Sequence, residues 1–242
     1  MGHVTVVGGC RAKAPSTGIL ASSLAVGTTV KLMEGGTAVE YLVNQGIPSN
    51  SNLYDASCDG TWLLRKYIHS ERQWDASNIN RYETSAINTW LNGEFFNTLG
   101  SAEQAAIKQV KIPYRADGGS GGTDQSGANG LPAKIFLLSG YEVGWTTSDD
   151  SDFPVDGAKL DYFTSGTTTS ANNKRIAYLS GTDTIWWLRS PSTDNAGRVW
   201  FVRSDGDYGD YGASDSDGIR PALILPKTAL FDTSTLILKG VA

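Results

Sequence analysis

The sequence has very few of the side chains that carry enzyme chemistry. Its 242 residues include two cysteines, Cys10 and Cys58, and two histidines, His3 and His69. His3 lies near the start of the chain, so a Ser-His-Asp or Cys-His arrangement has a single plausible base. We therefore expect no catalytic residues. Two cysteines so far apart predict reduced thiols, with a disulfide as the alternative.

Metal and cofactor motifs are missing as well. No CxxC or HxxxH spacing is present, and the glycine-rich residues 117–130 lack the spacing and the lysine of a P-loop. Aspartates alternate at 205–207 and 215–217 as in calcium loops, yet no Glu or Gln occurs from Ser190 to Gly218. We expect no metal and no cofactor, with a calcium ion as the alternative.

Long apolar runs and clusters of basic residues are also absent. No run approaches the ~18 apolar residues of a membrane-spanning helix, so we expect no membrane insertion. The first residues lack the apolar region of a secretory signal. The net charge is −5 and no Lys/Arg cluster occurs, so nucleic acid is a poor candidate partner.

What is present predicts a domain rich in strands and loops. Residues 28–33 and 38–43 alternate apolar and polar around a turn at 34–37, which predicts a hairpin. Further strands are expected at 62–68, 133–139 and 236–238, and residues 176–179 form a short apolar segment. Apolar spacings of three and four predict helices over 79–91 and 101–110, the second with a capping box from Ser101 to Gln104. The prediction is an α+β fold, with two helices packed on short, largely antiparallel strands joined by long loops. Residues 1–25 would form an N-terminal arm.

The stretch from Trp186 to Leu225 is the most unusual part of the chain. Its apolar ends enclose a segment, 190–218, built mostly of Asp, Gly, Ser, Tyr and Arg. Tyrosine among small polar residues is typical of antibody paratopes, which suggests an exposed binding surface. Strand alternation places Trp200 on one face and Phe201 on the other, so a buried Trp200 predicts an exposed Phe201. The alternative is that Phe201 is buried. Trp186 and Trp187 are expected in the core.

The motifs at the two ends of this stretch resemble those of a known class of proteins. WWLRSP at 186–191, followed after an interval by GIRPAL at 218–223, is similar to the hypervariable end of diversity-generating retroelement target proteins. Residues 53–66 and 133–143 resemble an uncharacterised domain family of gut bacteria and their phages. The resemblance implies a C-type-lectin-like fold over 26–242, with 190–218 diversified at adenines. Such codons do not yield Lys, Glu, Gln, Met or Trp. The stretch 190–218 contains none of the first four, and its one Trp, Trp200, would be a fixed core position.

The resemblance and the composition together predict a ligand-binding display protein. Its partner would be a protein or another surface ligand, and its setting a phage virion or a bacterial surface. Aspartates outnumber arginines in the segment, which favours a basic partner. The oligomeric state stays open. The rival interpretation is a carbohydrate-binding lectin or glycan-active enzyme that uses the acidic loops. The predicted surface consists of Ser192, Asp194, Asn195, Gly197, Arg198, Phe201, Arg203, Asp207, Tyr208, Asp210, Tyr211, Asp215 and Asp217.

Overall fold

Strands dominate the molecule. The computed structural model describes residues 17–45 and 51–242, and 34% of the chain is strand against 18% helix. The predicted α+β, C-type-lectin-like architecture is therefore wrong, because the helices are short and several separate sheets form the body. Of the predicted N-terminal arm, residues 1–16 lie outside the described residues, as do Cys10 and His3.

The first five-stranded sheet has the order β10-β17-β4-β3-β2, and its ladders are all antiparallel. Gly35 and Gly36 connect β2 and β3 with φ of 54° and 81°, the positive values that a tight hairpin turn requires. This confirms the predicted hairpin. The strands are β2 (Thr29–Glu34), β3 (Thr37–Gln45), β4 (Thr61–Arg65), β10 (Ile135–Phe136) and β17 (Ala222–Leu225).

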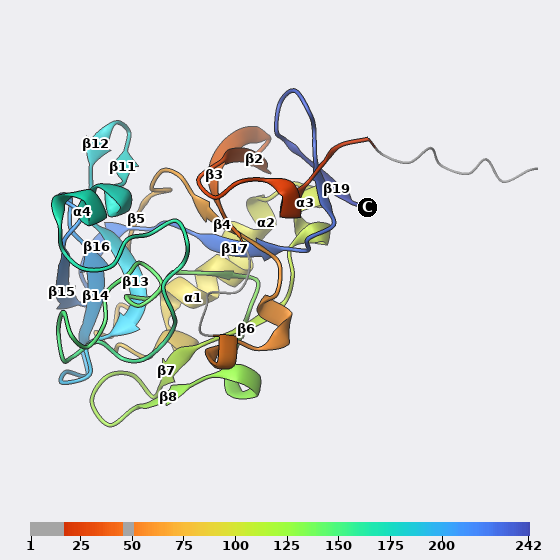
Figure 1. Cartoon of the computed structure of the whole chain (residues 1–242). Coiled ribbons are helices and arrows are strands. Elements are labelled where there is room, and N and C mark those ends of the chain that lie inside the picture. Colours follow the sequence, from red (N-terminus) through yellow and green to blue (C-terminus); the bar gives the residue numbers. More distant parts are fainter. Residues whose placement is uncertain (1–16, 46–50) are drawn as a thin grey trace, which may run out of the picture.

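The second five-stranded sheet is built almost wholly from the unusual stretch. Its order is β15-β14-β13-β16-β5, with β13 and β16 paired in parallel at Trp186 and Gly218. In Figure 1 this sheet lies at the left, opposite the C-terminal strand β19. The strands are β5 (Glu71–Gln73), β13 (Trp186–Pro191), β14 (Arg198–Val202), β15 (Tyr208–Gly212) and β16 (Ser216–Gly218).

Smaller sheets complete the body. Ile19 and Leu20, from the predicted arm, pair with β18 and so pack on the domain. The last strand begins at Leu238, later than predicted, because the Asp232 carboxylate accepts backbone bonds from Ser234 and Thr235 and closes a turn first. These strands are β1 (Ile19–Leu20), β6 (Val110–Ile112), β7 (Tyr114–Ala116), β8 (Thr123–Gln125), β9 (Leu131–Ala133), β11 (Tyr178–Leu179), β12 (Thr182–Asp183), β18 (Ala229–Phe231) and β19 (Leu238–Val241).

The helices are shorter than the sequence predicted. The segment 79–91 becomes helical only at α1 (Ala86–Trp90), where the Ser85 hydroxyl caps the first turn. The chain then continues as a π-helix, η5 (Leu91–Phe95), and α2 (Phe96–Thr98). The predicted capping box is wrong, since Gly100 is the N-cap of α3 (Ser101–Ala106) and no side chain caps it. Helix α4 (Thr169–Arg175) lies outside both predicted helices.

Short 3-10 helices occur at η1 (Ala21–Ser23), η2 (Ser51–Leu53), η3 (Ala56–Cys58), η4 (Tyr82–Thr84) and η6 (Gly127–Asn129).

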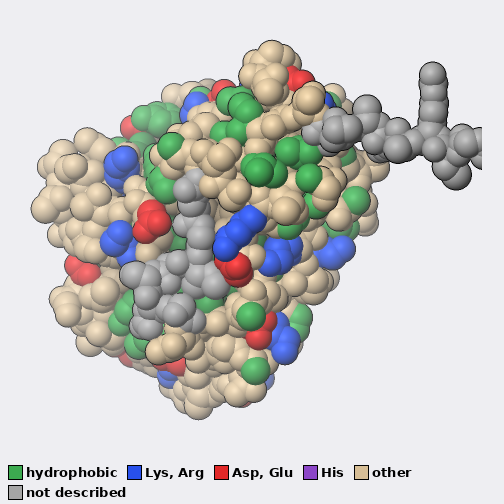
Figure 2. Space-filling view, turned by 45° about the vertical axis from the view of Figure 1, so that its right-hand side comes forward, with side chains coloured by type: hydrophobic (Ala, Val, Ile, Leu, Met, Phe, Trp, Pro, Cys, Tyr) green, Lys and Arg blue, Asp and Glu red, His purple; other side chains and the backbone are tan. Residues whose placement is uncertain are grey.

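The core contains Trp186, Trp187 and Trp200, which confirms their predicted burial. Across the described ranges, no helix has the length and apolar character needed to cross a membrane. Figure 2 brings the β19 side of the molecule forward, and basic and acidic side chains are interspersed on that face.

Candidate binding surface

The two end motifs form a buried frame, which we define as residues 186–191 and 218–223. Every residue of both segments is buried. The indole nitrogen of Trp186 donates to the carbonyl of Arg175 at 3.0 Å, and that of Trp187 donates to the carbonyl of Arg72 at 3.0 Å. The motifs therefore serve to fix the strands that flank the exposed segment.

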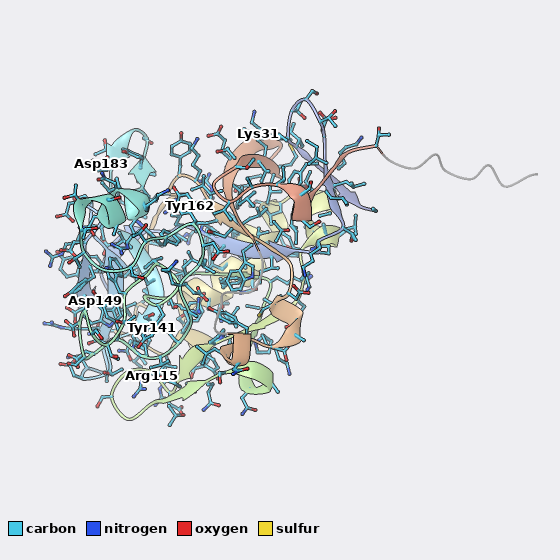
Figure 3. All side chains as sticks on the ribbon, viewed as in Figure 1. Lys31, Arg115, Tyr141, Asp149, Tyr162 and Asp183 are labelled. Atoms are coloured by element: carbon cyan, nitrogen blue, oxygen red, sulfur yellow. The ribbon has the colours of Figure 1, made fainter. Side chains whose placement is uncertain are left out.

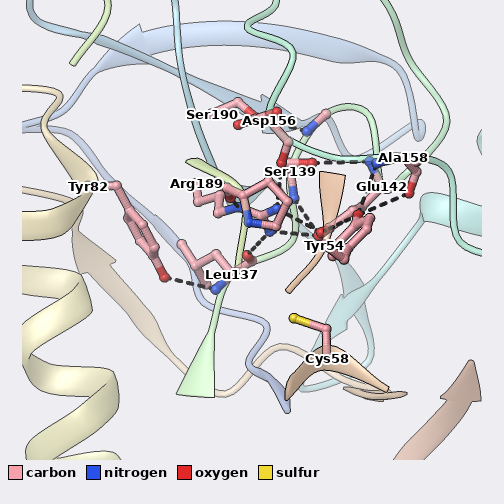
Figure 4. A network of polar contacts seen from close by, with 12 residues as sticks. Tyr54, Cys58, Tyr82, Leu137, Ser139, Glu142, Asp156, Ala158, Arg189 and Ser190 are labelled. Carbon is pink, nitrogen blue, oxygen red and sulfur yellow. Dashed lines mark hydrogen bonds and ion pairs between the residues drawn. The ribbon is translucent and has the colours of Figure 1, made fainter. Parts of the chain in front are cut away.

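A buried ion pair anchors the centre of β13 (Figure 4). Arg189 donates to both carboxylate oxygens of Glu142, at 2.6 and 2.7 Å, and both side chains are fully buried. Its remaining contacts are bonds to the carbonyls of Pro113, Leu137 and Asp156. Removal of one partner from such a pair leaves an uncompensated buried charge, so the network holds β13 to the segments around 137–142 and 156.

Ser190 extends this network. Its hydroxyl donates to the Asp156 carboxylate at 2.7 Å and accepts from the backbone of Gly140 at 2.9 Å. Burial raises the pKa of Asp156 to about 7, although the nearby Arg189 opposes that rise. The Tyr54 hydroxyl donates to Glu142, and burial raises the pKa of Tyr54. All of these groups are buried and bonded to one another, so we assign the network a structural role.

Most of the predicted surface residues reach solvent. The interval between the frame segments forms the hairpin of β14 and β15, with Trp200 opposite Asp210 and Val202 opposite Tyr208. The exposed positions are Asp194, Asn195, Arg198, Arg203, Tyr211 and Asp215, and the half-buried ones are Asp207, Tyr208, Asp210 and Asp217. The structure thus places most of these residues on the β14–β15 hairpin and the turns beside it, whereas Asp217 lies on β16, between β13 and β5.

Three predicted residues are buried, contrary to their expected display: Ser192, Gly197 and Phe201. Ser192 turns inward and donates to Asp194 at 2.8 Å, and a side chain at Gly197 would collide with Asn78. Phe201 is 1% exposed because both faces of β14 are covered. Phe153 covers the Trp200 face, and on the other face Phe201 packs beside Trp187, its partner on β13, and against the Tyr211 ring. The prediction of alternating buried and exposed residues assumes that one face of the strand is open to solvent, and here both faces of β14 are covered.

The two tyrosines of β15 have different surroundings. Tyr208 packs edge-on against Trp145, Phe153 and Trp200, and its hydroxyl donates to the carbonyl of Asp149 at 2.9 Å. Tyr211 is 47% exposed. Tyr208 is therefore part of an aromatic cluster, and Tyr211 is the tyrosine available to a partner.

A neighbouring loop supplies surface residues that the sequence did not predict. The carbonyl of Asp152 accepts from the Thr193 backbone and from the Trp200 indole, which places the loop 149–152 beside the hairpin. Asp149 lies next to these strands in Figure 3. We call Asp149, Asp150, Asp152, Asp194, Asp207 and Asp210 the acidic face.

Mutual repulsion within the acidic face has an electrostatic signature. The pKa of Asp152 is raised, first by partial burial and then by the charges of Asp194 and Asp150. Among the described residues, the cation paired within this face is Arg198, whose guanidinium lies 3.5 Å from Asp210 in an exposed ion pair. In the sequence, the loop 149–152 is marked only by its three aspartates. Nothing in that pattern indicates that the loop lies beside the β14–β15 hairpin.

A groove borders the acidic face. It encloses about 580 Å³ and is lined by 78–81, Thr84, Asp117, Ser120 and 195–197. The Asn80 carboxamide donates to the carbonyls of Asn195 and Arg198, both at 2.7 Å, and accepts from Gly119 at 3.0 Å. These bonds fix the wall of the groove that residues 195–197 of the segment 190–218 form.

Within 17–45 and 51–242, no group of three or more His, Cys, Asp or Glu side chains could hold a metal ion.

One family model, described as a domain of unknown function (DUF6273), matches residues 59–227. No curated protein and no solved structure matches the chain.

Proposed function

The chain belongs to the DUF6273 family, and we propose that this member is a ligand-binding display protein of the retroelement-diversified type. The observation that carries the proposal is the contrast between the frame and its interval. Every frame residue is buried, whereas the interval presents Asp194, Arg198 and Tyr211 to solvent. Substitutions at exposed positions on a fixed frame change the free energy of unfolding little, which is what diversification requires.

The ligand we propose is a protein surface that carries a basic patch. The acidic face concentrates carboxylates from two separate segments, with Arg198 as the paired cation. Such complementarity raises the association rate and excludes acidic partners. Tyr211, half exposed at the sheet edge, is the aromatic residue placed to anchor a partner.

Binding to candidate host surface proteins across a salt series tests the partner class. We expect the affinity to fall as salt rises, and to fall by at least about tenfold in Tyr211→Ala. Leu20→Ala is the control, since Leu20 is 41% exposed elsewhere on the molecule. Affinity that is indifferent to salt and equal in the two variants would contradict the proposal.

The gene itself tests the retroelement assignment. A near-copy of the stretch encoding 186–225, differing mainly at adenines and accompanied by a reverse transcriptase gene, is expected nearby. A genomic neighbourhood without both features would remove this part of the proposal while leaving the partner class open to the binding test.

The carbohydrate alternative has one feature in its favour, the groove beside Asn195. Asn78 contributes an exposed amide to a lining that is mostly polar, and such a group suits the hydroxyls of a sugar. A glycan array separates the two proposals. Glycan binding that Asn78→Ala abolishes and Tyr211→Ala leaves unchanged would favour the lectin.

A further inference from the structure

Three arginines are buried in the described structure, and they differ in how their charge is compensated. Arg189 has the Glu142 carboxylate. Arg175 donates to four backbone carbonyls and to the Asn172 side chain. Arg220 is 2% exposed and donates only to the carbonyls of Arg65, at 2.8 Å, and Lys66, at 3.3 Å.

Arg220 has a nitrogen without any partner. Its Nη1 is buried and makes no hydrogen bond with any described residue, and no described carboxylate lies within ion-pair distance of the guanidinium. Burial lowers the pKa of Arg220 to about 10. A buried charge and an unused donor both cost free energy, so an anion in contact with this group would be strongly favoured.

A pocket adjoins this arginine. It encloses about 230 Å³, and its lining includes Lys66, Tyr67, Tyr162, Asn173, Tyr178 and Arg220, completed by two aliphatic side chains. It lies where the end of β4, the loop before α4 and the end of α4 meet. Tyr162 is seen in Figure 3 between α4 and the β2–β3 hairpin.

The lining indicates the chemistry of the ligand. It contains no acidic residue, and the charge of Lys66 is already paired with Glu40 at 2.9 Å. Tyrosine rings, with Leu42 and Ile176, offer apolar contact beside the cation. The central carbon of the Arg220 guanidinium lies over the Trp186 ring, 5.0 Å from the ring centroid. A ligand that combines one anionic group with a carbon skeleton contacts both the cationic and the apolar part of this lining. The small volume of the pocket limits the size of that ligand.

We propose that this pocket binds a small organic carboxylate, whose charge the Arg220 guanidinium in the pocket lining compensates. The site is separate from the acidic face and does not depend on the display function. It gives Arg220 of the GIRPAL motif a role in binding besides its place in the frame.

Calorimetric titration with matched probes tests the proposal. The charged probes are sodium benzoate and sodium D-glucuronate, and their neutral counterparts are benzamide and D-glucose. We expect at least one carboxylate to bind, and its neutral counterpart to bind at least about tenfold more weakly. Benzoate alone would identify an aromatic acid, and glucuronate alone a carboxylated sugar. Binding of sodium sulfate without either carboxylate would overturn the proposal.

Variants of α4 locate the binding site without disturbing Arg220. Asn173 is exposed and lines the pocket, so Asn173→Trp should block the mouth and weaken carboxylate binding by at least about tenfold. Ser170→Trp is the control, because Ser170 is exposed on the same helix outside the lining. Equal affinity in both variants, equal binding of charged and neutral probes, or no carboxylate binding at roughly 50 mM would each refute the site.

Discussion

Tyr211 lies over Phe201, with the two ring centroids 4.3 Å apart and the ring planes inclined by 34°. The exposed tyrosine of β15 therefore covers a buried phenylalanine of β14. This pair joins the proposed binding surface to the core. A position that is available to a partner also contributes to stability.

The first prediction concerns Tyr211. Tyr211→Ala should lower the free energy of unfolding by about 1 kcal/mol, because the aromatic pair is lost and Phe201 is uncovered. Asp210→Ser should change it by no more than about 0.5 kcal/mol, since Asp210 makes only an exposed ion pair. Urea unfolding of the two variants checks both values. A loss above roughly 3 kcal/mol for Tyr211→Ala would show that this position cannot vary freely.

The second prediction separates Tyr208 from Tyr211. The sequence alone placed both tyrosines on the exposed binding surface, where alanine is expected to change stability little. The aromatic cluster around Tyr208 instead predicts a loss of about 3 kcal/mol for Tyr208→Ala. Tyr208→Phe keeps the ring and removes only the bond to Asp149, which should cost about 1 kcal/mol. Equal losses for the Ala and Phe variants would place the stabilisation in the hydroxyl and not in the ring.

The third prediction concerns the ion pair behind β13. Glu142→Gln should cost about 3–5 kcal/mol, because it leaves the Arg189 charge buried without its counter-ion. The double variant Glu142→Leu with Arg189→Met should recover much of that loss, since apolar side chains avoid the cost of burying charge. Thermal unfolding of both proteins makes the comparison. If the double variant lost as much stability as Glu142→Leu and Arg189→Met lose together when each is made alone, the hydrogen bonds and not the charges would hold β13.

Much of the local structure could be predicted from the sequence. The Gly35-Gly36 turn and the alternation on either side specified the hairpin of β2 and β3. The burial of Trp186 and Trp187 followed from their apolar surroundings. Helix length could not be predicted at 79–91, because apolar spacings of three and four also occur where a chain turns repeatedly. There residues 82–84 form the 3-10 helix η4 and Ser85 is extended, so the α-helix begins only at Ala86.

The candidate surface was predictable only in part, for a different reason. The composition of 190–218 indicated exposure, yet burial of Phe201 depends on Trp187 and Tyr211, which other strands supply. Asp149 and Asp152 reach the surface through contacts with residues about 40–60 positions later in the chain. Such contacts are set by tertiary packing and leave no periodic signal in the sequence.

The last prediction concerns pH and Asp156. Its pKa is about 7 in the folded protein, against an ordinary value of 3.8. Between these two values the folded state binds more protons than the unfolded state, so this group makes stability fall as the pH rises from about 4 to about 7. The full loss attributable to Asp156 is about 4 kcal/mol. Asp217, with a pKa of about 6, acts in the same direction. His69, whose pKa is lowered mainly by burial, acts in the opposite direction.

A matched variant isolates the contribution of Asp156 from these other groups. Asp156→Asn resembles the protonated acid and does not titrate, so its stability should fall less between pH 4.5 and pH 7.5 than that of the unchanged protein. Urea unfolding at the two pH values gives the difference directly. Parallel pH profiles for the two proteins would mean that Asp156 does not titrate in this window. A smaller decline in the variant would trace the pH dependence to the carboxylate that accepts from Ser190, and so to the frame itself.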